Sequence, residues 1–276
     1  MNVKNVKFRF TIVVMFVYVV LCVAYAILYT QLSFIESEYT LCIEDQYNYC
    51  PTYHGYYEPL DAVVDNNKRK LGSIVNQEPE VMLGYLCTSG DYIEAWETWD
   101  AIQNKAEEIC KDVKSENGYS YDYLCVRELA KYVAYNTYYD WDAFYNHVGI
   151  DTINVKTVME TKRATCAGYS NYFVALCEAR GYNTVNFRGG VPAESYDIGY
   201  EDLENSPTNH EWVGVYIDNR LVLIDITWMS SNWYINGEKH TGKRIRYDYF
   251  DLDFESFCVE HRIDLAEERN FGEIFK

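Results

Sequence analysis

The chain has 276 residues, of which 49% are hydrophobic and 24% are charged. This composition is typical of a globular protein and excludes disorder over most of the length. The formal net charge is -18 at pH 7, and such an acidic surface repels phosphate backbones, so nucleic acid is a poor partner.

The first predicted element is an apolar segment at residues 10–29 that contains no charged residue. As a helix it would span about 30 Å, the thickness of the core of a bilayer. Three bases and no acid precede it, at Lys4, Lys7 and Arg9, and this asymmetry places residues 1–9 in the cytoplasm. The segment is therefore expected to be a transmembrane signal anchor of a single-pass cell-membrane protein whose later residues lie outside.

A cleaved signal peptide is the alternative for the same segment. Ala24, Tyr25 and Ala26 have the small-x-small form of a cleavage site after an apolar stretch. Cleavage would give a secreted protein, and both interpretations export the remainder of the chain. The acidic surface of that exported part is expected to give solubility and, as a sharper hypothesis, to favour cationic substrates.

The nine cysteines are many for a cytosolic protein and typical of an exported one. Cys22 lies in the apolar segment and Cys166 belongs to the candidate site described below, so an odd number remains. Cys177 is expected to stay unpaired because it lies on the apolar face of a predicted helix. Disulfides are predicted among the other six, in an order that the sequence leaves open: Cys42, Cys50, Cys87, Cys110, Cys125 and Cys258. No pair of cysteines has the CxxC spacing of a zinc site, so neither a structural metal nor a cofactor is expected.

Residues 30–115 are predicted to form a stalk followed by a helical extension. Turn-forming residues punctuate the chain up to about residue 90, so this part is expected to be irregular. Apolar residues then recur at helical spacing from Trp99 to Val113. A second helix is predicted at residues 121–135.

Residues 116–276 are predicted to form one domain of the α+β class, with helices packed on an antiparallel sheet. A helix from Cys166 to Arg180, stopped by Gly181, precedes the strands. Strands are expected at residues 184–188, 212–217 and 221–226, the last two joined in a hairpin around Asp218 and Asn219.

Cys166 begins its predicted helix, where unpaired backbone N–H groups and the helix dipole favour an anion. A thiolate is therefore favoured there, and a nearby imidazolium would favour it further. The same N–H groups can receive an oxyanion. One position thus supplies a nucleophile and half of an oxyanion hole.

The predicted hairpin brings a histidine and an aspartate together. With a two-residue turn, Trp212 faces Asp225 and His210 faces Thr227, and all four side chains lie on one face of the sheet. His210 and Asp225 are then diagonal neighbours, within reach of a hydrogen bond if the strands twist. A three-residue turn would place them on opposite faces, so this prediction depends on the turn.

Each of these residues also has an ordinary interpretation. An isolated cysteine at a helix start is more often a buried residue or half of a disulfide, and a lone histidine at a strand edge is more often a satisfied polar group. Asp225, however, lies between Ile224 and Ile226 and needs a partner to offset its desolvation. His210 is the nearest candidate, and the three residues together indicate a site.

Three sequence blocks carry a resemblance to a known family. They have the forms C-x-G-Y-S, H-x-W and D-x-T-W, and they begin at Cys166, His210 and Asp225. The chain resembles the transglutaminase-like family in these blocks, over roughly residues 120 to 265. The resemblance implies a papain-type fold for residues 116–276 as the catalytic domain, with Cys166 as nucleophile, His210 as its base and Asp225 as the group that orients the histidine.

The expected reaction is thiol-dependent hydrolysis of a peptide or isopeptide amide bond through an acyl-enzyme. Acyl transfer to an amine, which cross-links proteins, uses the same intermediate and is the first alternative. A non-catalytic binding module of the same fold is the second. The expected partner is a protein or peptide substrate, together with the membrane through residues 10–29 unless they are removed.

Overall fold

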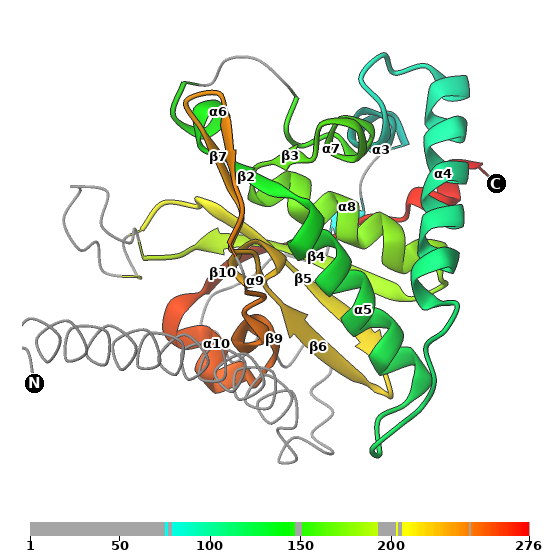
Figure 1. Cartoon of the computed structure of the whole chain (residues 1–276), viewed down its shortest axis with the longest axis vertical. Coiled ribbons are helices and arrows are strands. Elements are labelled where there is room, and N and C mark those ends of the chain that lie inside the picture. The colour runs from blue at the N-terminus through cyan, green and yellow to red at the C-terminus, as the bar shows by residue number, and fades with distance from the viewer. Residues whose placement is uncertain are drawn as a thin grey trace, which may run out of the picture. The chain divides into compact units, whose positions relative to one another are not determined.

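A computed structural model describes residues 75–76, 79–146, 151–192, 203, 206–242 and 244–275 of the chain (Figure 1). The predicted membrane segment at residues 10–29, the flank before it and the predicted stalk up to residue 74 lie outside the described residues. Within the described ranges, no helix is both long and apolar enough to cross a membrane.

The main sheet has six strands in the order β1-β10-β4-β5-β6-β9. Neighbouring strands are antiparallel except for β1 and β10. Its strands are β1 (Val75–Asn76), β4 (Asn183–Gly190), β5 (His210–Ile217), β6 (Arg220–Ile224), β9 (Phe250–Leu252) and β10 (Arg262–Glu268). The antiparallel sheet of the prediction is therefore confirmed.

The hairpin of β5 and β6 closes in the predicted two-residue turn. Ile217 pairs with Arg220, and Asp218 and Asn219 between them have φ values of 53° and 61°. Positive φ at both central residues is the geometry of the hairpin turn that follows the natural twist of strands. This turn fixes the register of β5 against β6.

The predicted continuation of the second hairpin strand to residue 226 is wrong. The strand pairing stops at Val213 and Ile224, and Asp225 becomes the N-cap of a short helix, α9 (Ile226–Met229). The N–H of Asp225 bonds instead to the carbonyl of Tyr249, at 2.9 Å. The face-to-face pairs expected for Asp225 and Thr227 therefore do not form, because a short acidic side chain stabilises a helix start.

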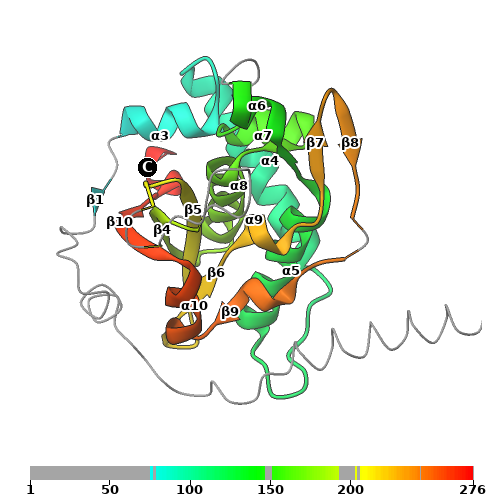
Figure 2. The ribbon, with the colours of Figure 1, turned by 90° about the vertical axis from the view of Figure 1, so that its left-hand side faces the viewer.

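Helices cover both faces of the main sheet. Besides α9, they are α3 (Pro79–Leu86), α4 (Tyr92–Cys110), α5 (Tyr121–Asn136), α6 (Trp141–Asn146), α7 (Val155–Thr161), α8 (Cys166–Ala179) and α10 (Phe254–Glu260), with short 3-10 helices η1 (Tyr247–Tyr249) and η2 (Phe271–Phe275). Figures 1 and 2 show α4, α5 and α8 on one side of the sheet and α10 on the other.

Helix α3 lies in the part that was expected to be irregular, so that expectation is wrong for residues 79–86. Met82 and Leu86 of α3 are buried in the core that α8 occupies, and this tertiary packing stabilises a helix that turn signals obscure. Helix α4 begins at Tyr92, where the Asp91 side chain accepts a hydrogen bond from the N–H of Ile93. The predicted helices at residues 121–135 and 166–180 are confirmed within one residue at their ends.

A second, smaller sheet stands beside the main one. It contains β3 (Arg163–Ala164), β2 (Tyr138–Asp140), β7 (Trp233–Ile235) and β8 (Glu238–His240), in that order. Asp142 of α6 accepts hydrogen bonds from the N–H groups of Asn236 and Gly237, at 2.8 and 3.0 Å. These bonds tie α6 to the turn between β7 and β8, and both ribbon views show the two elements side by side (Figures 1 and 2).

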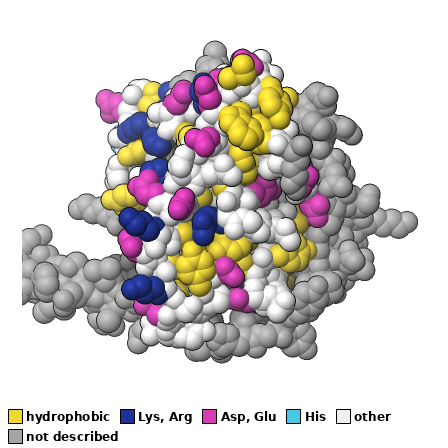
Figure 3. Space-filling model, turned by 90° about the vertical axis from the view of Figure 1, so that its right-hand side faces the viewer, with side chains coloured by type: hydrophobic (Ala, Val, Ile, Leu, Met, Phe, Trp, Pro, Cys, Tyr) yellow, Lys and Arg dark blue, Asp and Glu magenta, His cyan; other side chains and the backbone are white. Residues whose placement is uncertain are grey.

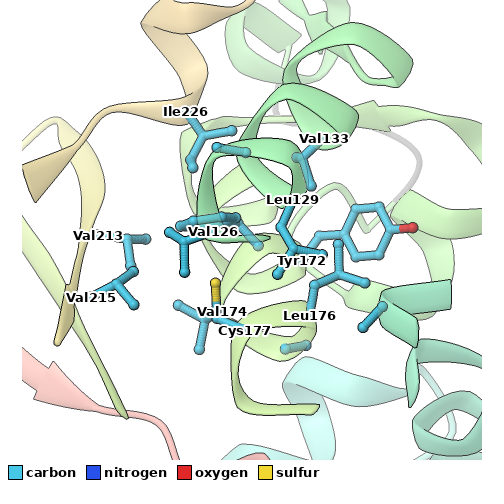
Figure 4. Packing of buried hydrophobic residues seen from close by; sticks show 14 of the residues in the cluster. Val126, Leu129, Val133, Tyr172, Val174, Leu176, Cys177, Val213, Val215 and Ile226 are labelled. Atoms are coloured by element: carbon cyan, nitrogen blue, oxygen red, sulfur yellow. The ribbon is translucent and has the colours of Figure 1, made fainter. Parts of the chain in front are cut away.

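Helix α8 is the centre of the larger core. Its residues from Gly168 to Cys177 are all buried, as expected for a helix that is apolar on nearly every side. Figure 4 shows Val174 and Cys177 of α8 between α5 and the β5 residues Val213 and Val215. On the opposite face of the sheet, Trp212, Phe187 and Phe257 belong to a separate cluster under α10. The position of the α8 N-terminus is thus fixed by packing on several sides.

The predicted disulfides do not form among the buried cysteines of this core. Cys87, Cys110 and Cys125 are free thiols, as are Cys166 and Cys177, and Cys42 and Cys50 lie outside the described residues. Burial raises the pKa values of the Cys87, Cys110 and Cys177 thiols. These side chains pack as small apolar groups, which is a common use of buried cysteine.

The surface near α4 combines apolar and charged side chains. Figure 3 shows this face, where hydrophobic side chains gather in patches and Lys and Arg lie among Asp and Glu. Tyr92, Ile93 and Trp96 at the start of α4 are exposed, and Tyr92 and Trp96 contact the Phe275 ring of η2. The acidic charge of the chain is therefore not gathered into a field of one sign on this face.

Candidate active site

Cys166 is the first residue of α8 and is half-buried. The extended residue Thr165 precedes it as the N-cap and donates its N–H to the carbonyl of Thr152, at 3.3 Å. A Cβ on Gly168 would lie 1.9 Å from the same carbonyl oxygen. The glycine of the C-x-G-Y-S block is therefore required so that the first turn of α8 can pack against the backbone at Thr152.

The tyrosine of the same block anchors α8 to two neighbouring elements. The Tyr169 hydroxyl is fully buried, donates to the carbonyl of Thr137 at 2.7 Å and lies 3.2 Å from Ser230 Oγ. Ser230 in turn donates to the carbonyl of Ala134, at 2.7 Å. These bonds join the start of α8 to the end of α5 and to the segment after α9. Helix α9 carries the aspartate of the site, Asp225, as its N-cap.

His210 and Asp225 are in direct contact. His210 begins β5 and is 8% exposed, while Asp225 is fully buried, and His210 Nε2 lies 2.7 Å from Asp225 Oδ2. The contact that was expected from strand register arises by another route, since Asp225 reaches the histidine from the N-cap of α9. Its other carboxylate oxygen, Oδ1, accepts the N–H of Trp228 at 3.0 Å.

Cys166 is the third residue at this place. Its thiol lies close enough to His210 to help raise the pKa of the imidazole, and Nδ1 is the ring nitrogen that Asp225 leaves unoccupied. The structure therefore brings together Cys166, His210 and Asp225. They come from the start of α8, the start of β5 and the cap of α9, which are separated by dozens of residues in sequence.

The electrostatics of the pair favour a charged histidine. Burial alone would lower the pKa of His210, but the Asp225 charge, the hydrogen bond that His210 donates to Asp225 and the nearby Cys166 thiol outweigh it and raise the pKa to about 10. Burial alone would likewise raise the pKa of Asp225, but the charge and hydrogen bond of His210 and the hydrogen bond of His261 hold it below its usual range. An imidazolium beside the helix N-terminus is the environment that stabilises a thiolate.

His261 is a site residue that the sequence did not reveal. It follows α10, is 1% exposed, and its Nε2 lies 3.0 Å from Asp225 Oδ2. Its Nδ1 lies 3.2 Å from the carbonyl of Phe257, and its ring stacks on the Phe257 ring with 4.0 Å between centroids. The sequence offered only a weak signal, a histidine near the end of the stretch that resembles the family.

The tryptophans of the second and third blocks enclose the histidine. The Trp228 ring lies 5.3 Å from the His210 ring in a stacked arrangement, and Trp212 lies 6.0 Å from it. Trp228 is also 4.7 Å from the His261 ring. Aromatic rings on these sides exclude water from the imidazoles and strengthen the hydrogen bonds to Asp225.

His210, Asp225 and His261 also bring three possible metal-ligand atoms within 4.8 Å of one another. Both Nε2 atoms, however, point to Asp225 Oδ2 at hydrogen-bond distance. A nitrogen that donates to a carboxylate has no lone pair for a metal. The proximity of the three groups is thus explained by their hydrogen bonds to each other.

A cavity of about 450 Å³ opens beside His210. Its lining includes His210 but not Cys166, so it lies on the histidine side of the site. Much of its wall is aromatic, from Tyr139, Trp141, Phe144, Trp228 and Trp233.

An α+β fold in which a central helix begins with a cysteine and packs on an antiparallel sheet that carries the histidine is the papain-type arrangement. Residues 107–230 match the family model described as Transglutaminase-like superfamily, and this range includes all three residues of the candidate site. The chain therefore carries a transglutaminase-like domain, and the predicted fold is confirmed.

The individual relatives match a shorter segment. Kyphoscoliosis peptidase from Mus musculus is 31% identical over 75 residues, and the same peptidase from Homo sapiens is 29% identical over 75 residues. Each match covers 26% of this chain and 11% of the relative. The chain thus spans about a tenth of the length of the curated relatives that it matches.

Two solved structures are similar in part. A candidate cysteine protease from Cytophaga hutchinsonii has a TM-score of 0.37 and 11% identity, over 61% of this chain and 42% of that one. A TGase structure has a TM-score of 0.35 and 20% identity, over 62% of this chain and 41% of that one.

Proposed function

We propose that this protein hydrolyses peptide or isopeptide amide bonds with Cys166 as nucleophile, His210 as general acid and base, and Asp225 as the group that orients His210. The observation that carries the proposal is the buried pair of His210 and Asp225, 2.7 Å apart, with Cys166 at the N-terminus of α8 near enough to help raise the pKa of His210. A buried carboxylate that binds an imidazole is costly to maintain without a use for it.

The first half of the reaction transfers the acyl group to sulfur. The Cys166 thiolate attacks the amide carbon, and the backbone N–H of Cys166 receives the resulting oxyanion. His210 donates its Nδ1 proton to the amide nitrogen as the carbon–nitrogen bond breaks. The amine departs, a thioester remains on Cys166, and His210 is neutral.

The second half returns the enzyme to its starting state. Neutral His210 takes a proton from water, and the hydroxide attacks the thioester carbon. The carbon–sulfur bond breaks, a carboxylic acid leaves, and the thiolate faces an imidazolium again. An amine in place of water would give acyl transfer by the same steps.

His261 acts in this scheme as a positioning residue. Asp225 accepts hydrogen bonds from Trp228 N, His210 Nε2 and His261 Nε2. With both of its oxygens bonded, the carboxylate cannot rotate, and the His210 ring is held with Nδ1 toward the thiol. His261 touches neither the thiol nor a substrate in this role.

The test combines thiol labelling with turnover. Iodoacetamide at neutral pH is expected to label Cys166 in the folded protein, with much slower labelling after His210→Ala. Cys166→Ala assigns the label, and the buried thiols Cys110 and Cys177 serve as internal controls. A peptide library is expected to be cleaved by the wild type and not by Cys166→Ala. Cleavage that survives Cys166→Ala would reject the mechanism.

A further inference from the structure

The cavity beside His210 occupies the side of the site that the leaving amine must use. His210 lines this cavity, whereas Cys166 does not. In the proposed reaction, His210 delivers a proton to the amide nitrogen, so the part of the substrate that follows the scissile bond lies next to the imidazole. The chemistry of this cavity therefore indicates which leaving fragments fit.

One wall of the cavity is a continuous aromatic surface from α6 and the small sheet. Tyr139 and Trp141 have ring centroids 4.4 Å apart, and Trp141 and Phe144 meet edge to face at 5.6 Å. Phe144 and Trp233 are 39% and 41% exposed, which is unusual for side chains of this size. A large apolar side chain that packs on this wall would remove much of that area from water.

Most polar side chains of the lining are bonded within the protein, whereas the buried Thr227 Oγ1 has no hydrogen-bond partner among the described residues. Both ends of the Asn209 amide bond to the backbone of Val191, at 3.0 and 3.2 Å. Asn232 Nδ2 donates to the carbonyl of Tyr135, at 2.7 Å, and Ser230 Oγ donates to a backbone carbonyl. These groups shape the cavity and leave little unused hydrogen-bonding capacity for a ligand.

Arg246 differs from these bonded side chains because it carries a charge. It is exposed, it lines the cavity, and its Nη2 donates to the Tyr249 hydroxyl at 3.0 Å while the guanidinium lies over the Tyr249 ring at 4.6 Å. Among the described residues, it pairs with no carboxylate, and none of the described lining residues is acidic. A guanidinium presents five N–H donors, so most of them are available to an anion.

We propose that this cavity binds the leaving fragment of the substrate through a large apolar side chain on the aromatic wall and a carboxylate at Arg246. The inference rests on the proposed function and adds a substrate class to it. It replaces the hypothesis of a cationic substrate for this side of the site, because a cation would meet a guanidinium here and no acidic side chain of the described lining. The carboxylate is either an acidic side chain or the C-terminus of a peptide.

The experiment uses four peptides with the acyl segment that the library selects and a phenylalanine directly after the scissile bond. The next residue is glutamate, glutamine or lysine in three amidated peptides, and the fourth has glutamine with a free C-terminal carboxylate. The wild type is expected to cleave one of the two carboxylate-bearing peptides with a KM about fivefold lower than the amidated glutamine peptide. Which of the two is preferred distinguishes a side chain from a C-terminus.

Arg246→Ala is expected to abolish that preference by raising the KM of the preferred carboxylate-bearing peptide to that of the amidated glutamine peptide. Arg246→Glu is expected to reverse it in favour of lysine. Arg244→Ala is the matched control, since Arg244 is exposed and two residues away but does not line the cavity. Equal KM values for all four peptides, or an equal loss for every peptide in Arg246→Ala, would overturn the inference.

Binding to the inactive Cys166→Ala protein separates this inference from the proposed function. The isolated leaving fragments, phenylalanyl-glutamate amide, phenylalanyl-glutamine amide and phenylalanyl-glutamine with a free carboxylate, are titrated while tryptophan fluorescence is recorded, since Trp141, Trp228 and Trp233 line the cavity. Tighter binding of a carboxylate-bearing fragment that Arg246→Ala removes supports the cavity assignment even if no peptide is cleaved. Cleavage without any charge preference would overturn the assignment of the cavity and would leave the proposed hydrolase function intact.

Discussion

The substitution Asp225→Asn tests the charge that the site keeps buried. Asp225 is fully buried and accepts hydrogen bonds from His210, His261 and the N–H of Trp228. Asparagine has the same shape and retains an acceptor for Trp228, but it removes the negative charge. His210 then loses the main group that favours its protonated form, while its burial remains.

The size of the effect follows from the pKa of His210. A histidine in an unfolded chain titrates near pH 6.5, and the folded protein raises the pKa of His210 to about 10. The stabilisation is therefore complete below about pH 6.5 and is lost as the pH rises through about 10. It amounts to about 4 kcal/mol at pH 7 and about 1 kcal/mol at pH 9, and the former agrees with the usual cost of breaking a buried ion pair.

The assay is the free energy of unfolding in urea, measured for the wild type and Asp225→Asn at pH 7 and pH 9. Asp225→Asn is expected to cost several kcal/mol at pH 7 and much less at pH 9. Asp251→Asn is the matched control, because Asp251 pairs with Arg220 and a guanidinium does not titrate in this range. A cost of Asp225→Asn that is equal at the two pH values would refute the reasoning.

Four further expectations follow from other parts of the molecule. Burial raises the pKa of Glu178 to about 8. The stability of the folded protein therefore falls as the pH rises from about 4.5 through about 8, because the buried carboxyl resists ionisation while the unfolded one ionises. Glu178→Gln is expected to unfold at a higher temperature than the wild type at pH 8.5 and not at pH 5. His261→Phe removes a hydrogen-bond donor to Asp225, so the free energy of unfolding in urea is expected to fall by about 1–3 kcal/mol. On acidification, this variant is expected to lose stability at a higher pH than the wild type, and His261→Gln is expected to recover part of both effects. Gly168→Ala places a Cβ 1.9 Å from a carbonyl oxygen and is expected to lower the melting temperature, whereas Gly84→Ala, with nothing within 4 Å, is not. Export through residues 10–29 stays a prediction, and protease added to intact cells is expected to digest the domain; fragments that appear only after lysis would contradict it.

Local sequence patterns predicted the parts of the fold that depend on neighbours in the chain. The turn at Asp218 and Asn219, the helix that begins at Cys166 and the strand that contains Trp212 all follow from periodicity and turn chemistry, and the structure has them. The three sequence blocks also indicated Cys166, His210 and Asp225 as candidate site residues. The hydrogen bonds of Asp225 with His210 and His261 are a finding of the structure.

The parts that sequence could not supply depend on contacts between distant segments. His261 reaches Asp225 across 36 residues because α10 packs on the opposite face of the sheet. The aromatic wall of the cavity combines α6 with β7, which pair through Asp142 and a turn almost a hundred residues later. A histidine and a set of aromatic residues have no local pattern that distinguishes these positions from ordinary core residues.

The spacing of the D-x-T-W block has a physical explanation in the cap of α9. Asp225 ends the hairpin because its Oδ1 caps the helix at the N–H of Trp228, three residues on, at 3.0 Å. The cap fixes the carboxylate so that Oδ2 points to the imidazoles of His210 and His261. The same helical turn places the Trp228 ring over His210, at 5.3 Å. One short helix therefore sets both the charge behind the histidine and the aromatic cover above it, and a shift of either residue by one position would lose one of the two.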